Sequence, residues 1–258
     1  MDFVAQRVWL PKIGAVKAVF HRRFFGSPRM CTVVSTLMGK FFISIVVEDG
    51  NSPPPKVTDQ KSVGIDVGLA TYITLSTGEK VENPRHLQNA LKRLRCLHRR
   101  LSKKERGSRN REKARQRLAS CYERIGNQRA VFQHKLSMRL IRENQAIMVE
   151  SLNIGGLIRN RRLAQLIADA AWSQFLAMLR YKAKWYGVTL IEIGRFAPMS
   201  KRCHGCWHLN ERLTMSDRTW TCPACLLPLD RDVNAAINIK MMGLGFIITP
   251  REPRAGPV

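Results

Sequence analysis

Four cysteines in the C-terminal third of the chain have the spacing of a metal site. They form two Cys-x-x-Cys pairs, Cys203 with Cys206 and Cys222 with Cys225, and fifteen residues separate the pairs. This spacing is typical of a four-cysteine zinc site, in which each pair contributes two thiolates to a tetrahedron. Because four thiolates leave no coordination position for water, a zinc ion held there would be structural. Disulfides or four unrelated buried cysteines are the alternatives, but neither explains the double spacing.

Three acidic residues could hold a second kind of metal. Asp66 lies in an alternating apolar stretch between glycines, Glu150 ends a short apolar stretch, and Asp232 opens a predicted helix at 233–242. Carboxylate oxygens favour Mg²⁺ or Mn²⁺, and two such ions about 3.5–4 Å apart would promote phosphodiester hydrolysis. Each acid alone is more typical of a surface residue or a helix cap, and Asp230 is a candidate cap. Their combination is what favours a nuclease centre.

The elements that carry these acids follow an α/β pattern. Apolar alternation predicts a strand around Asp66, a second strand at 71–75 and a turn at 76–78. Short apolar runs predict buried strands at 146–150 and 188–193, and an amphipathic helix is predicted at 162–186, with Trp185 in the core. The order of strand, helical insertion, strand, helix, strand and helix is typical of a ribonuclease H-like fold.

A long basic segment separates the first two acids. Apolar residues at three- to four-residue spacing predict two helices, and Gly107 with Ser108 breaks them into a hairpin over 85–142. A solvated charged face is one interpretation, but few acids balance this block, so contact with a phosphate backbone is favoured. The residues predicted to bind nucleic acid are Arg93, Arg99, Arg100, Lys103, Lys104, Arg109, Arg111 and Lys113.

The overall charge points to the same kind of partner. The chain of 258 residues has 44 Lys and Arg against 19 Asp and Glu, a net charge of +25, which favours nucleic acid ahead of a membrane surface. No apolar run reaches membrane-spanning length and the first residues do not resemble a secretion signal, so we expect no membrane partner. Together with cysteines in metal spacing, this favours a bacterial or archaeal cytosol and association with the nucleoid.

The two ends of the chain are predicted to differ from its middle. Residues 1–50 predict four short strands, at 7–10, 15–20, 30–36 and 41–48, which would make a small sheet or part of a barrel. Three consecutive prolines predict a linker over 51–61. Residues 244–258 predict a flexible tail.

Several segments resemble the transposon-encoded TnpB (OrfB) proteins, which are related to the type V CRISPR nucleases. The matching segments are GIDVGLATY (64–72), GSRNREKARQRLA (107–119), IMVESLNI (147–154), DAAWSQFLAMLRYKAKWYG (169–187), the paired CxxC and DRDVNAAINI (230–239), while WLPKIGAVKAVFHRR (9–23) is similar to the end of the family's N-terminal wedge barrel. The resemblance implies an RNA-guided DNA endonuclease, in which a guide RNA pairs with target DNA and a RuvC-like site cuts.

The resemblance also implies residue roles and domains. By motif position, Asp66, Glu150 and Asp232 correspond to the three catalytic acids, and the four cysteines to the zinc ligands. The implied domains are a partial wedge β-barrel at 1–50, a RuvC-like nuclease domain at 62–198 with the hairpin inserted, a zinc ribbon at 199–228, and a final RuvC-like helix at 229–243.

Three departures from the family pattern bear on function. Compared with the family pattern, we expect the N-terminal part of the wedge barrel and the helical recognition insertion to be missing, and a homodimer, a partner or a large RNA could supply them. Trp207 and Leu226 stand where the family usually has glycine, and Ser151 stands where it often has Asp. A nucleic-acid-binding protein that no longer cuts, such as a guided DNA-binding repressor or an RNA-binding transposition accessory, is the alternative function. A DNA-strand transferase is disfavoured, because the family is implied to be dispensable for transposition chemistry.

Overall fold

The computed structural model describes residues 1–36, 38–48, 50, 61–161, 163–194, 199–214 and 216–248. The chain divides into two compact units, Met1–Ser52 and Pro53–Val258. Of the predicted linker at 51–61, only Lys61 lies within the described residues.

The first unit contains the four predicted strands in two separate pairs. β1 (Arg7–Leu10) pairs antiparallel with β2 (Gly14–Lys17), and β3 (Ser27–Ser35) pairs antiparallel with β4 (Phe41–Glu48). Every residue of β3 is exposed, and Val8 is the buried hydrophobic residue among those described here. The described part therefore forms two small sheets and does not close into a barrel.

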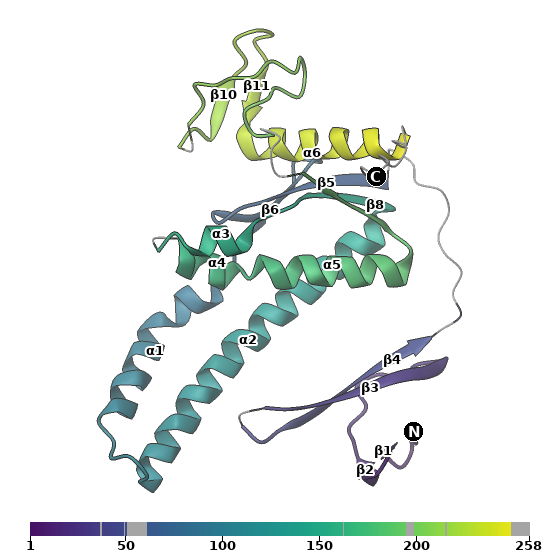
Figure 1. Cartoon of the computed structure of the whole chain (residues 1–258), viewed down its shortest axis with the longest axis vertical. Helices are drawn as coiled ribbons and strands as arrows, with labels where there is room; N and C mark the ends of the chain where they lie inside the picture. The colour runs from purple at the N-terminus through teal and green to yellow at the C-terminus, as the bar shows by residue number, and fades with distance from the viewer. Residues whose placement is uncertain are drawn as a thin grey trace, which may run out of the picture. The chain divides into compact units, whose positions relative to one another are not determined.

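The second unit is built on a five-stranded mixed sheet in the order β7-β6-β5-β8-β9 (Figure 1). Its strands are β5 (Ser62–Val67), β6 (Thr71–Leu75), β7 (Lys80–Glu82), β8 (Ala146–Glu150) and β9 (Thr189–Ile193). β5, β8 and β9 are parallel, whereas β6 and β7 are antiparallel additions at one side. The predicted α/β class is confirmed, because helical crossovers join the parallel strands.

Helices cover both faces of this sheet. α6 (Arg231–Ile248) lies on one face, and α5 (Trp172–Tyr186) lies on the other together with the C-terminal part of α2 (Arg109–Glu143), as Figure 1 shows. α1 (His86–Ser102) and α2 form the predicted hairpin, and the short helices α3 (Ile154–Ile158) and α4 (Ala164–Ala170) follow β8. The zinc-motif segment carries two short strands, β10 (Thr219–Thr221) and β11 (Pro228–Asp230), which pair antiparallel.

Three details of the sequence predictions are wrong. The single helix predicted at 162–186 is two helices, because Ala171 takes a left-handed conformation with φ 48° between α4 and α5. Trp185 is 60% exposed and is not part of the core. Residues 244–248 were predicted as part of a flexible tail, but they belong to α6, while the rest of that predicted tail, residues 249–258, lies outside the described residues.

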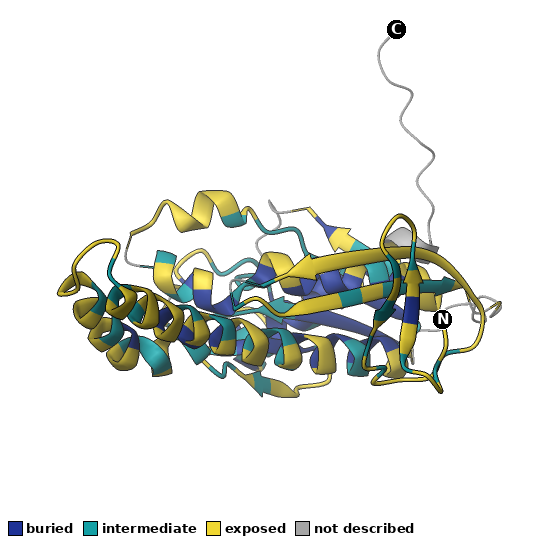
Figure 2. Cartoon of the chain, turned by 90° about the horizontal axis from the view of Figure 1, so that it is seen from below, coloured by how far each residue is buried: buried dark blue, intermediate teal, exposed yellow. Residues whose placement is uncertain are grey.

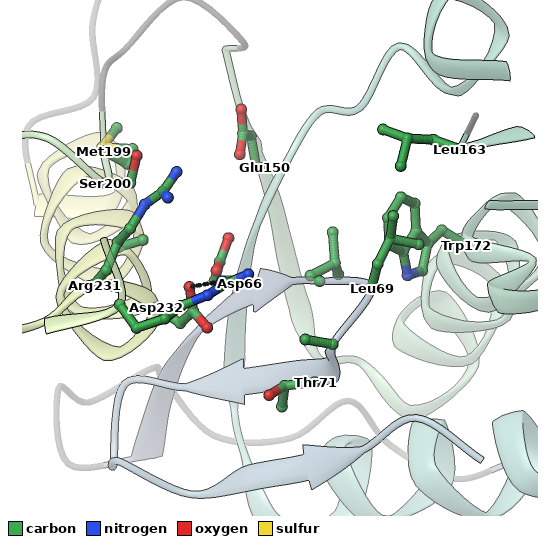
Figure 3. A pocket seen from close by; sticks show the side chains of 15 residues that line it. Asp66, Leu69, Thr71, Glu150, Leu163, Trp172, Met199, Ser200, Arg231 and Asp232 are labelled. Atoms are coloured by element: carbon green, nitrogen blue, oxygen red, sulfur yellow. Dashed lines mark ion pairs between the residues drawn. The ribbon is translucent and has the colours of Figure 1, made fainter. Parts of the chain in front are cut away.

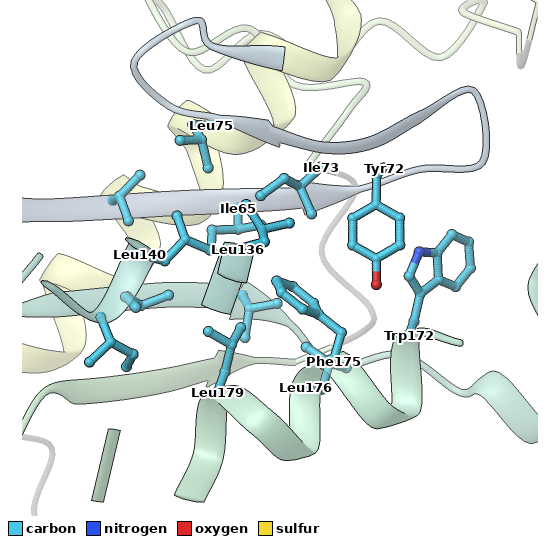
Figure 4. Packing of buried hydrophobic residues seen from close by; sticks show 14 of the residues in the cluster. Ile65, Tyr72, Ile73, Leu75, Leu136, Leu140, Trp172, Phe175, Leu176 and Leu179 are labelled. Atoms are coloured by element: carbon cyan, nitrogen blue, oxygen red, sulfur yellow. The ribbon is translucent and has the colours of Figure 1, made fainter. Parts of the chain in front are cut away.

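The main core lies between the sheet and α2, α4 and α5. Figure 4 shows Ile65 and Ile73 of the sheet packed against Phe175 and Leu179 of α5. Tyr72 is also fully buried, and its hydroxyl donates to the Ala170 carbonyl at 3.2 Å. Burial of this kind stabilises by about 1.5–3 kcal/mol per large apolar side chain, and it fixes the strands that end at the acidic residues.

On the other face of β5, Gly64 lets α6 approach closely. A Cβ atom placed on Gly64 would lie 2.0 Å from the Ala236 carbonyl oxygen and 2.6 Å from the Lys240 nitrogen of α6. A Cβ atom on Gly243 would lie 2.1 Å from the Met148 side chain of β8. Two glycines, one in β5 and one in α6, thus allow the helix and the sheet to pack closely.

The helical hairpin has its own small core and is tied to the sheet domain. Leu94, Leu118, Cys121 and Ile125 are buried between α1 and α2, while Figure 2 shows that exposed residues cover much of the two helices. Asp169 of α4 accepts hydrogen bonds from the Leu87 and Gln88 nitrogens, at 2.8 and 3.0 Å, and so caps α1 from another element.

Candidate active site and metal site

The sheet register brings two of the acids to adjacent strand ends. Ile65 pairs with Val149 in the parallel ladder of β5 and β8, so Asp66 and Glu150 follow side by side at the carboxyl edge. Asp232 is the second residue of α6, the helix that covers one face of the sheet. All three line one pocket of about 560 Å³, which Figure 3 shows from close by. The structure thus brings together three residues that are separated by 84 and 82 positions in the chain.

Asp230 fixes the start of the helix that carries Asp232. Its Oδ1 accepts hydrogen bonds from the Asp232 and Val233 nitrogens, at 3.1 and 3.0 Å, which confirms the predicted helix cap. Its Oδ2 also lies 2.6 Å from Lys80 Nζ of β7. A cap and an ion pair therefore hold the N-terminus of α6 against the far side of the sheet.

The pocket is electrostatically unfavourable for its own carboxylates. Burial, together with the charges of Asp232 and Glu150, raises the pKa of Asp66 to about 7, although Arg231 opposes this shift. Burial also raises the pKa of Glu150. A divalent cation would relieve this repulsion, and an all-oxygen donor set suits Mg²⁺ or Mn²⁺. The residues present therefore fit such an ion.

The carboxylate oxygens of the three acids are less closely gathered than the sulfur atoms of the four cysteines. Among the described residues, the four-cysteine set is the group of His, Cys, Asp and Glu whose ligand atoms are gathered closely enough to hold one ion, all within 4.8 Å of one another. The three acids do not form such a group. They line an open pocket and do not close a single coordination sphere.

Two arginines complete the polar side of the pocket, and neither was predicted. Arg218 comes from the segment between the cysteine pairs, and its Nη1 lies 3.6 Å from Asp232 Oδ1. Arg231 lines the pocket from the first turn of α6, and its Nη1 donates to the Thr214 carbonyl at 3.1 Å. The position of Arg231 between two acids was a usable signal, whereas Arg218 is placed by tertiary folding alone.

The other side of the pocket is apolar. Leu69 follows β5, Leu163 precedes α4 and Trp172 begins α5, and Figure 3 shows these three side chains across the pocket from the acids. A pocket with charged groups on one side and apolar groups on the other suits a ligand with a phosphate and a less polar body.

The four cysteines form two turns of the same geometry. In the first turn the Trp207 nitrogen donates to the Cys203 carbonyl, and in the second the Leu226 nitrogen donates to the Cys222 carbonyl, each at 2.9 Å. Trp207 and Leu226 have φ values of 63° and 60°, so both adopt the left-handed conformation that glycine takes most easily. With the four sulfur atoms within 4.8 Å of one another, the arrangement is compatible with a structural zinc ion.

The thiols of this cluster already differ in acidity. Burial raises the pKa of Cys222, but backbone N–H groups of Cys225 and Ala224 and the neighbouring thiols lower it, to about 6. The His208 N–H lowers the pKa of Cys206, yet the neighbouring thiols raise it to about 12. Four thiols at this distance cannot all ionise without a cation, and a bound metal ion supplies that charge.

Two buried asparagines join the cysteine segment to α6, and sequence analysis missed them. Asn234 Oδ1 accepts from the His204 nitrogen at 2.9 Å, while its Nδ2 donates to the Arg202 carbonyl at 2.8 Å. Asn238 Nδ2 donates to the same carbonyl at 2.6 Å and to that of Met199 at 2.8 Å. Two asparagines four residues apart on an apolar helix face were the available signal.

The predicted nucleic-acid-binding residues lie on the hairpin, and one of them has a second role. Arg93, Arg99, Arg100, Lys103, Lys104, Arg109 and Lys113 are exposed. Arg111 is partly buried, and its Nη1 donates to the Leu101 and Lys104 carbonyls at 3.2 and 2.8 Å. Arg111 thus stabilises the C-terminal end of α1. None of the helices in the described ranges is long and apolar enough to cross a membrane.

Comparison with known proteins decides the family. Residues 44–161 match the OrfB_IS605 family ("Probable transposase"), and residues 172–239 match the "Cas12f1-like, TNB domain" family. A Streptomyces pristinaespiralis protein named "Putative RNA-guided DNA endonuclease" is 44% identical over 217 residues, which is 84% of this chain and 53% of that protein. The chain belongs to the OrfB/TnpB family.

Other members of the TnpB family are also similar, but they are longer. The Escherichia coli (strain K12) protein named "Putative RNA-guided DNA endonuclease InsQ" is 30% identical over 258 residues, covering 94% of this chain and 63% of that protein. The chain thus spans a little over half the length of these two relatives. A solved structure titled "Cryo-EM structure of CRISPR-Cas12f Ternary Complex" aligns with TM-score 0.53 at 20% identity, covering 81% of this chain and 44% of that one, and shows a similar fold.

Proposed function

We propose that this chain carries the nuclease centre of an RNA-guided DNA endonuclease, with Asp66, Glu150 and Asp232 as its catalytic acids. One observation carries the proposal: acids from β5, β8 and α6, far apart in sequence, line one pocket and raise the pKa of Asp66. Perturbed acids in a pocket are typical of functional sites. The RNA-guided part of the proposal rests on the names of the relatives.

The topology supports a RuvC-like, ribonuclease H-like nuclease domain. The parallel strands β5, β8 and β9 with two antiparallel strands beside them leave the carboxyl edge open, where ligands bind in α/β sheets. In this proposal the domain spans residues 62–198 and is completed by α6, and residues 199–228 form a zinc ribbon.

The acids would hold divalent cations, and the arginines would hold the substrate. Bound Mg²⁺ or Mn²⁺ supplies Lewis-acid chemistry for phosphodiester hydrolysis by the two-metal route. Arg218 and Arg231 lie on the same side of the pocket as the acids and can bind the phosphate. Leu69 and Trp172 cover the opposite side, where they contact the sugar or base and restrict water.

The zinc site has a supporting role in this proposal. Four thiolates leave no open position for chemistry. The segment that they hold carries Arg218, and buried asparagines attach it to α6. Zinc would therefore fix both an arginine and the helix of Asp232 at the mouth of the pocket.

Cleavage of labelled DNA tests the proposal. The chain is purified with its co-purifying RNA, which is sequenced, and target DNA matching that RNA is supplied with Mg²⁺. Native protein should cut, whereas Asp66→Asn and Asp232→Asn should lose about a thousandfold or more in rate, since removing one key catalytic group commonly costs that much. Glu82→Gln removes an exposed acid outside the pocket and should cut like native protein.

The alternative of a non-cleaving binder predicts a different result. If native protein and Asp66→Asn bind RNA and DNA equally well and neither cuts with Mg²⁺ or Mn²⁺, the nuclease proposal fails. The chain would then be a guided or RNA-binding accessory of the kind that its charge alone supports.

A further inference from the structure

One face of the α1–α2 hairpin is hollowed along its length. Three adjoining hollows of about 610, 490 and 420 Å³ lie between the two helices, and Arg117 lines all of them. They extend from His86 and Gln128, near the sheet domain, to Lys104 at the far end of α1. We call this continuous depression the hairpin groove.

The groove is lined by positive charge. Its cations include Arg93, Arg100, Lys104, Lys113, Arg117 and Arg124, all exposed. No acidic side chain of the described residues lines any of the three hollows. Along each side of the hairpin these cations are four or seven residues apart, which is about one or two helical turns, so they form one row on each side of the groove.

The rest of the hairpin surface is different. Arg115 is paired with Glu112 at 2.9 Å, and the His98 ring bonds the Tyr122 hydroxyl at 2.9 Å. Lys92 and Arg95 are exposed but line none of the hollows. Cations therefore lie both inside and outside the groove, and the described lining of the groove differs in containing no acidic side chain.

The dimensions of the groove suit one strand of nucleic acid. Packed helices have axes about 8–10 Å apart, so the depression between them admits a sugar–phosphate strand but not a duplex. α1 has 17 residues, which gives the groove a length of about 25 Å. Cations one turn apart, at about 5.4 Å, can each meet a successive phosphate of an extended strand.

Uncharged polar groups interrupt the cations and favour RNA. Asn110, Ser120 and Gln128 line the groove and are exposed. Amide and hydroxyl groups can exchange hydrogen bonds with ribose 2′-hydroxyls, which DNA lacks. The side chains of Leu97, Ala114 and Cys121 supply an apolar floor for the sugars.

We propose that the hairpin groove binds a single RNA strand, with its phosphates on the two rows of cations and its 2′-hydroxyls on the uncharged polar groups. This inference deepens the proposed function by assigning a place to the guide RNA. It does not depend on cleavage, so the two can fail separately.

The test compares two charge-matched double variants of the whole chain. Arg100→Gln with Arg117→Gln removes two groove cations, and Lys92→Gln with Arg95→Gln removes two cations from outside it. A second groove pair, Lys104→Gln with Lys113→Gln, guards against a folding defect in the first, and thermal unfolding checks all three. Binding of a labelled single-stranded RNA, and of DNA with the same sequence, is measured over a range of salt concentrations in the Asp66→Asn background.

The groove variants should lose RNA affinity by about tenfold or more near physiological salt. The slope of log K against log salt should fall by about 1.4, or about 0.7 for each lost phosphate contact. The Lys92/Arg95 variant should change both quantities much less. In addition, Ser120→Ala with Gln128→Ala should weaken RNA more than DNA.

Two results would overturn the proposal. Equal losses from groove and outside variants would show that diffuse charge, and not the groove, binds the strand. If the protein binds RNA and DNA with equal affinity, and if Ser120→Ala with Gln128→Ala changes neither affinity, the assignment of the groove to RNA fails. Either result leaves the nuclease proposal standing, whereas failure of cleavage leaves the groove assignment standing.

Discussion

At the scale of single residues, the pocket places acidic side chains where their ionised forms are unfavourable unless a cation is bound. Asp66 is the centre of this arrangement, because its pKa is raised to about 7 by burial and by Asp232 and Glu150. The sequence showed the three acids and the glycines beside Asp66. It could not show the convergence, which depends on the register of β5 with β8 and on the capped start of α6.

Replacing Asp66 by Asn should stabilise the metal-free protein at neutral and higher pH. The folded-state pKa is above the ordinary value of 3.8, so the folded state holds a proton that the unfolded chain has lost. Stability is therefore lost as pH rises from about 4 to about 7, and the Asn variant should avoid a cost of roughly 2–4 kcal/mol. Urea unfolding in EDTA at pH 5 and pH 8 measures this. A variant no more stable than native protein at pH 8 would contradict it.

The backbone of Leu226 is strained, and a substitution at this position can relieve the strain without changing any of the four cysteines. Its φ of 60° costs a non-glycine residue about 1–2 kcal/mol, and its side chain is 74% exposed, so little packing is lost on truncation. Leu226→Gly should make the cysteine segment more stable by about 1 kcal/mol and slow the release of zinc to a chelator. Cys222→Ser in the same assay should abolish zinc binding. Faster release from Leu226→Gly would show that the side chain supports the turn.

At the scale of elements, close helix–sheet contact determines where Asp232 lies. Periodicity predicted the strands and the hairpin because their apolar stripes are long and regular. Periodicity did not separate α4 from α5, because the sequence gives no sign that Ala171 adopts a left-handed conformation. Extending the apolar stripe along that single predicted helix also placed Trp185 in the core. The asparagines of α6 were overlooked because their partners are carbonyl groups some thirty residues earlier.

Gly64→Ala should move α6 away from β5. The added Cβ would lie 2.0 Å from the Ala236 carbonyl oxygen, and backbone cannot yield cheaply. We expect a loss of about 2–4 kcal/mol in unfolding free energy, together with reduced cleavage, because Asp232 moves with the helix. Gly126→Ala in α2 is the matched control, since nothing lies within 4 Å of its added Cβ, and it should be neutral or slightly stabilising. Equal stability of the two variants would refute the packing argument.

At the scale of the whole molecule, the two units differ in how far each can stand alone. Residues of the second unit form a layered core on both faces of the sheet, whereas the described strands of the first bury little. Composition predicted the division and the basic character, because both are sums over many residues. The pairing of the first four strands was not predictable, since an exposed two-stranded sheet carries no buried face to set it.

A fragment of residues 61–258 should fold by itself. We expect a cooperative thermal transition within a few degrees of the whole chain, and zinc content near that of the whole chain. Circular dichroism and metal analysis of the two proteins check this. A fragment that lacks a cooperative transition would show that the first unit contributes to the core of the second.

Binding of Mn²⁺ tests the central claim most directly, because it requires neither guide nor target. Electron paramagnetic resonance of the whole chain, titrated with Mn²⁺ after its zinc content is verified, reports the bound ion. The account predicts that native protein and Glu82→Gln bind Mn²⁺ alike, while Asp66→Asn, Glu150→Gln and Asp232→Asn each weaken binding by about tenfold or more. Native-like binding by all three variants would contradict a shared divalent-cation pocket.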